Sequence, residues 1–120
     1  MGTDWSAVGV GFLVVVIAGV IGSVLPVVGQ AGAGLLGGFV AGHLAGGGLL
    51  RGGWHGLLAG SVAGIVLSVA LAIVVTLFGS IAGPELGFLS GASVLVVGLV
   101  VTALFALDSA IGGAIGGALD

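Results

Sequence analysis

The chain has 120 residues, of which 59% are hydrophobic and only 4% are charged, and its formal net charge is −3. Soluble domains carry about 25% charged residues on a hydrated surface, so this composition excludes an ordinary soluble domain and predicts an integral membrane protein. A single basic residue leaves no surface for a nucleic acid, and the lack of cysteine excludes disulfides and thiolate metal sites.

Four apolar segments follow one another along the chain. They cover residues 6–25, 30–50, 54–78 and 88–119, and each is long enough as a helix to cross a hydrocarbon core of roughly 30 Å. Because short connections make neighbouring helices antiparallel, we predict an all-α integral membrane protein. Its expected architecture is an up-down-up-down bundle of four transmembrane helices in one domain, residues 1–120.

The loop between the second and third segments fixes the expected orientation. Arg51 lies in this loop, with Gly52 and Gly53 after it, and basic residues favour the cytoplasmic side of a membrane. An even number of spans then places both termini in the cytoplasm with this loop. Trp5 and Trp54 begin the first and third segments at the same face, as interfacial tryptophans do. The sequence thus predicts a multi-pass protein of the cell membrane.

Small residues recur every fourth position, and residues four apart share one face of a helix. Such faces let two helices approach closely in lipid, where apolar burial gives no gain. We expect the second and third helices to form the tight centre of the bundle, with a further row ending the fourth. One row could instead face another protomer. The predicted packing residues are Gly34, Gly38, Gly42, Gly46, Gly56, Gly60, Gly64, Gly112 and Gly116.

Few ionisable residues lie near the spans, and such groups are candidate sites by default. His43 falls inside the second segment, and Asp108 shares a helical face with Gly112 and Gly116. Asp108 is buried or interfacial depending on where the fourth helix begins. These positions predict a polar cluster at one end of the bundle, formed by His43, Arg51, His55 and Asp108.

This cluster has two interpretations, a structural cap that satisfies loop ends and a proton relay or ion site. No spacing places the two histidines on one helical turn, so we predict no metal site. No serine or lysine is paired with a base in the pattern of an activated nucleophile. We therefore expect no enzymatic activity and no cofactor.

Three stretches, "GGFVAGHLAGGG", "WHGLLAG" and "SAIGGAIGGAL", resemble a family of small glycine-rich membrane proteins of unknown function from halophilic archaea. The resemblance covers most of the chain and implies a halophilic host and a four-span topology. The acidic, lysine-free composition suits such a host. Because the function of this family is unassigned, the resemblance implies no catalytic residues.

Two functions are compatible with these features. The first is a non-enzymatic membrane protein that packs as a compact four-helix unit, with the lipid bilayer and further copies or other membrane proteins as partners. The alternative is a small ion or solute transporter or channel that uses Asp108 with His43. Abundant packing motifs and scarce polar groups favour the first.

Overall fold

The computed structural model describes residues 2–119, and within this range the chain forms helices and no strands. Four α-helices account for nearly all of it. They are α1 (Trp5–Gly22), α2 (Pro26–Ala45), α3 (Leu49–Gly79) and α4 (Pro84–Ala118). The four predicted apolar segments therefore correspond to four helices, although α2, α3 and α4 begin four or five residues earlier than expected and α2 ends at Ala45 instead of residue 50.

Local sequence explains where the helices begin. The Asp4 carboxylate accepts a hydrogen bond of 3.1 Å from the Ala7 N–H and so caps α1. Both α2 and α4 begin with a proline, a residue whose fixed φ suits the first helical position and whose missing N–H is not needed there. A residue that favours a helix start thus stands at the beginning of α1, α2 and α4.

The turn between α2 and α3 consists of three glycines. Gly46, Gly47 and Gly48 have φ values of +64°, +83° and +96°, which glycine adopts without the strain that a Cβ would cause. The Gly52 N–H already donates to the Gly48 carbonyl at 2.9 Å. The turn therefore ends before Arg51, which lies in the first turn of α3, whereas the sequence predicted a loop at residues 51–53.

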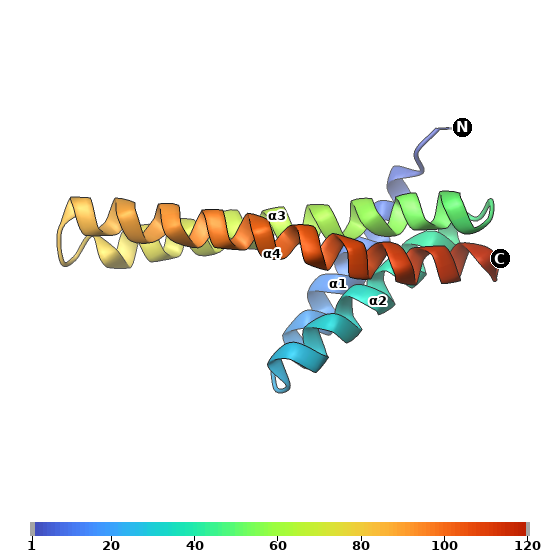
Figure 1. The fold of residues 1–120 in the computed structure, drawn as a ribbon, viewed down its shortest axis with the longest axis horizontal. Coiled ribbons are helices and arrows are strands. Elements are labelled where there is room, and N and C mark those ends of the chain that lie inside the picture. The colour runs from blue at the N-terminus through green and yellow to red at the C-terminus, as the bar shows by residue number, and fades with distance from the viewer. Residues whose placement is uncertain (1, 120) are drawn as a thin grey trace.

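The helices form two hairpins, α1/α2 and α3/α4, that cross obliquely near the end holding both chain termini (Figure 1). Hydrogen bonds and close contacts show that α1 runs in the direction of α3, since Asp4 meets His55 and Gly11 meets Ala59. Within the described residues α1 contacts α2 and α3 but not α4. Beyond the crossing, the α3/α4 hairpin extends alone.

The glycine row of α2 and that of α3 both face α4. A Cβ added at Gly38 or Gly56 would collide with the main-chain oxygen of Ser109, and one added at Gly42 or Gly52 would collide with that of Gly113. This differs from the expectation that α2 and α3 form the tight centre. Because α4 also presents glycines, main chains approach it closely from both sides, and α4 is the central helix.

The core consists of small residues, and large apolar side chains point outward. Buried hydrophobic residues are mostly alanines, while most leucines and isoleucines are exposed. This inverts the usual soluble arrangement and suits a surface that faces lipid. Three helices, α1, α3 and α4, are long and apolar enough to cross a membrane, whereas α2 is not among them. The protein is therefore membrane-like, with three helices that meet the criteria for spans.

Candidate functional site

The two chain ends and the start of α3 come together at one end of the molecule, which we call the polar end. His55 is its buried centre, with 1% of its surface exposed. Its Nε2 accepts the Asp4 N–H at 2.8 Å, and its Nδ1 lies 2.7 Å from the Arg51 carbonyl oxygen. An imidazole that carries its hydrogen on Nδ1 satisfies both bonds. His55 therefore fastens the start of α1 to α3.

A second hydrogen bond lies beside His55. The Trp54 Nε1–H donates to the hydroxyl of Thr3 at 3.2 Å, and Trp54 keeps half of its surface exposed. Residues 3 and 4 are thus held by two consecutive residues of α3. This arrangement gives Trp54 and His55 a positioning role at the polar end.

His43 lies on a different side of this end. It is exposed, stacks on Phe39 with ring centroids 5.9 Å apart, and its Nδ1 is 3.4 Å from the Gly116 carbonyl oxygen. In the described residues, no hydrogen bond joins His43 to the other members of the predicted cluster. The one bond among the four predicted residues is that between His55 and the Arg51 main chain.

Arg51 folds back over the glycine turn. Its Cδ lies close to Gly47, and its Nε is buried with no hydrogen-bond partner among residues 2–119. A salt bridge from Arg51 to Asp108 is not formed within this range. The arginine is therefore associated with the turn and not with the acidic residue of α4.

Asp108 lies deeper, where α2 crosses α4. Its Oδ2 is buried without a hydrogen-bond partner in the described part of the chain, and it touches Gly34 of α2. Ten residues separate Asp108 from the end of α4 at Ala118, a distance of about 15 Å along the helix. If the polar end lies at the membrane boundary, this carboxyl group lies near the middle of the hydrocarbon core.

The predicted packing glycines, Gly46 aside, have neighbours within close reach on other helices. Gly60 and Gly64 meet Ser109 and Thr102 of α4, while Gly112 and Gly116 meet the main-chain oxygens of Leu35 and Phe39 on α2. Gly46 instead forms part of the turn to α3. The rows are therefore occupied by contacts within this chain.

Several polar residues between the helices were not predicted to be part of a site. Ser109 is 0% exposed, and its hydroxyl has no partner among the residues described. Ser68 and Thr102 place their hydroxyl oxygens 3.3 Å apart between α3 and α4. The Gln30 amide donates to the Gly19 carbonyl at 3.0 Å and so joins α2 to α1. The signal for α4 was present, because small residues recur there at every third or fourth position, at Thr102, Ala106, Ser109 and Gly113.

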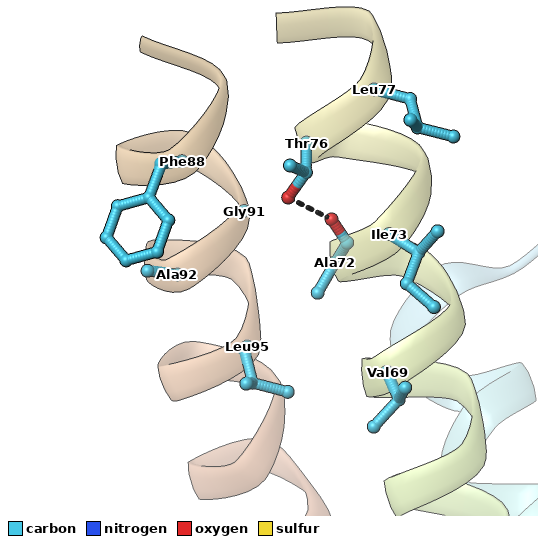
Figure 2. Close-up of a pocket in the computed structure, with 9 residues that line it drawn as sticks. All are labelled: Val69, Ala72, Ile73, Thr76, Leu77, Phe88, Gly91, Ala92 and Leu95. Carbon is cyan, nitrogen blue, oxygen red and sulfur yellow. Dashed lines mark hydrogen bonds between the residues drawn. The ribbon is translucent and has the colours of Figure 1, made fainter. Parts of the chain in front are cut away.

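Two apolar grooves lie along the α3/α4 hairpin. The smaller, of about 460 Å³, lies near the turn between these helices, with Phe88 and Gly91 of α4 opposite Ala72 and Thr76 of α3 (Figure 2). The Thr76 hydroxyl donates to the Ala72 carbonyl at 2.7 Å. The larger groove, of about 760 Å³, runs from Gln30 of α2 along the part of the hairpin that extends alone.

The side chains of the polar end and of the two grooves offer little reactive chemistry. Within residues 2–119, no three His, Asp or Glu side chains are grouped so that they could hold a metal ion.

A family model described as a family of unknown function, DUF5518, matches residues 5–119, which include all four helices. The chain belongs to the DUF5518 family. No curated protein and no solved structure gives a significant match to this DUF5518 member.

Proposed function

We propose that this DUF5518 protein is a non-enzymatic, multi-pass membrane protein whose four helices all cross the bilayer, and that it associates with a second copy of itself through the α3/α4 hairpin. The large groove beyond the crossing of the two hairpins carries the proposal. The proposed location is the cell membrane of a halophilic host, with Arg51 and both termini on the cytoplasmic side.

The position of the chain ends supports a fourth span. If only α1, α3 and α4 crossed the membrane, residues near the two termini would lie on opposite sides. Asp4 instead bonds to His55 near the start of α3, and Gly117 lies against Gly52 in the same region. Crossing of α2 as well satisfies this placement. An interior of glycines also explains why α2 is the least apolar of the four.

Several hydroxyl groups and the His55 imidazole support a non-enzymatic role, because they are engaged in hydrogen bonds with the main chain. The hydroxyls of Ser23, Ser80 and Ser93 each donate to a carbonyl of the preceding turn. Both ring nitrogens of His55 lie within hydrogen-bond distance of main-chain atoms. In these positions the side chains form hydrogen bonds with main-chain groups, as expected of a protein whose role is helix packing.

The uncovered part of the hairpin supports association with a second copy. Near the polar end, this chain's own α2 packs on the small residues of α4. The groove continues along the hairpin from Gln30, and its floor includes Gly64, Ser68 and Gly98. Since close contact between small-residue faces drives helix association in lipid, a helix of the same kind fits this continuation. A lipid chain is the competing occupant.

Single cysteines test this proposal, because the chain has none of its own. Val97 borders the groove and is 62% exposed, and Ile17 on the outer face of α1 is 60% exposed. We expect Val97→Cys to give disulfide-linked dimers in oxidised membranes, and Ile17→Cys to give several-fold fewer. Equal yields, or no dimer from Val97→Cys, would refute the second-copy proposal and leave lipid in the groove.

The alternative, a transporter that uses Asp108 with His43, receives less support. His43 stacks on Phe39 and approaches Gly116, whereas Asp108 lies against Gly34, more than two helical turns earlier along α2. The pair is therefore not brought together by α2. Asp108 by itself has a different significance.

A further inference from the structure

The contact between α2 and α4 is formed almost entirely by main chains. Gly38 and Gly42 of α2 lie directly against the backbone of Ser109 and Gly113. Where α2 begins to meet α4, the contact differs, because Gly34 faces the carboxyl group of Asp108. One acidic side chain is thus built into an interface where α2 presents glycines and the main chains approach closely.

Two adjacent residues of α4 place oxygen atoms in this interface without partners. Asp108 Oδ2 and Ser109 Oγ are both buried, and neither has a hydrogen-bond partner among residues 2–119. Ser109 is 0% exposed and lies between Gly38 of α2 and Gly60 of α3. The Phe105 ring covers the same site, since its Cε2 lies 3.1 Å from a Cβ placed on Gly34. Both oxygens are acceptors, and only Ser109 carries a hydrogen to donate.

The other charged and titratable groups of the described chain lie towards the ends of their helices. Helix α1 contains no charged or titratable residue. The remaining groups are Asp4 before α1, His43 on α2, Arg51 and His55 on α3, and Glu85 on α4. His55 and Arg51 are engaged at the polar end, and Glu85 is at the opposite end of α4. No cation therefore faces Asp108 from the elements packed against it.

We propose that Asp108 is a proton-binding site inside the membrane, and that the proton bound there controls how closely α2 packs on α4. The proton is taken from water, forms an O–H bond on the carboxyl group, and returns to water when that bond breaks. Protonation removes the charge, and it gives the carboxyl group an O–H that can donate a hydrogen bond, as the Ser109 hydroxyl also can. Asp108 as a whole is half-buried, but its Oδ2 is buried without a partner, and a carboxylate oxygen in that position has no such compensation.

A metal cation fits the site less well than a proton. Hard cations bind several oxygen ligands at once. Here α2 contributes Gly34 and Gly38, which have no side chains, and the carbonyls inside a helix already accept helical hydrogen bonds. Asp108 and Ser109 alone are too few ligands. A proton needs one acceptor, which the site provides.

Deprotonation would change the packing of α2 because the contact at this level depends on the close approach of the two helices. Gly34 and Gly38 have no side chain that could anchor α2 on α4, so a negative charge placed against Gly34 favours separation of the helices there. Water entering the gap would then solvate the carboxylate. The proposal is independent of self-association, since Asp108 lies on the α2 side of α4.

Infrared spectroscopy of the protein in lipid vesicles tests this site, because a protonated carboxyl group absorbs apart from a carboxylate. At neutral pH we expect a protonated-carboxyl band that is lost in Asp108→Asn and kept in the matched control Glu85→Gln. As the pH is raised, the wild-type band should disappear and the thermal unfolding temperature in detergent should fall. Asp108→Asn, which cannot ionise, should show no such fall.

Three results would overturn the proposal. They are the absence of the band at neutral pH, its persistence in Asp108→Asn, and its removal by sodium ions at constant pH, which would indicate a cation site. If Asp108→Asn does not fold, Asp108→Glu replaces it, and the wild-type band should then shift in frequency instead of being lost. The Val97→Cys dimer yield is measured in parallel, so that failure of either proposal is seen separately.

Discussion

Gly113 of α4 has the main chains of two other helices close to it. Both α2 and α3 approach it, because Gly42 and Gly52 each lie against its carbonyl oxygen. A Cβ added at Gly113 itself would lie 2.7 Å from Gly56 Cα and 2.9 Å from Gly56 N. These neighbours are backbone atoms, which cannot rotate away as the end of a side chain can.

Replacement of Gly113 by alanine should therefore destabilise the protein. Ordinary contact begins at 3.4 Å, so α3 must retreat by about 0.7 Å (3.4 minus 2.7) from Gly56 Cα alone. Overpacking of this kind costs about 1–3 kcal/mol, and the higher helix propensity of alanine returns at most about 1 kcal/mol. We expect the free energy of unfolding to fall by about 2 kcal/mol, the upper overpacking cost less this return.

Unfolding in mixed micelles with increasing denaturing detergent, followed by circular dichroism, measures this loss. Gly9→Ala and Gly32→Ala are matched controls on α1 and α2, because a Cβ at either position meets nothing within 4 Å. Both controls should be as stable as the wild type or slightly more stable. A Gly113→Ala protein that unfolds together with these controls would contradict the predicted overpacking and would show that α3 and α4 are not held at backbone contact.

Two further predictions concern the polar end and the turns. His55→Ala leaves the Asp4 N–H without its acceptor and removes the side-chain bond to the Arg51 carbonyl, so the free energy of unfolding should fall by about 1–3 kcal/mol; an unchanged value would deny His55 its fastening role. If all four helices cross the membrane, Ser23→Cys and Ser80→Cys, in the two hairpin turns, should react with an impermeant maleimide from the same side. Labelling of Ser80→Cys alone would mean that α1/α2 enters the bilayer without crossing it.

The helices themselves could be predicted because uninterrupted apolar runs and the prolines at residues 26 and 84 are local signals. The fourfold spacing of Gly34, Gly38 and Gly42 likewise identifies a smooth face on α2. Spacing does not identify which helix meets that face. Since α3 and α4 present equally small residues, the choice of α4 depends on how the two hairpins cross, which is a long-range property.

The polar residues show the same division. Trp54 and His55 stand out in the sequence, but their partners, Thr3 and Asp4, come from a segment some fifty residues away, and no short-range pattern links them. His43 was predicted inside the second segment, yet a stacked Phe39 and the direction of the helix face leave it exposed. Ser109 attracted no attention because a serine among glycines resembles any other small residue.

The central position of α4 also bears on the order in which the protein is made. During synthesis, α1, α2 and α3 leave the ribosome first, and the glycine rows of α2 and α3 then have no α4 to pack against. The first hairpin must wait in the lipid, held chiefly by α1/α2 contacts and by the Asp4–His55 bond. Because α4 follows these three helices and completes both interfaces, assembly of the bundle should be a late event that a ribosome stalled before α4 would abolish.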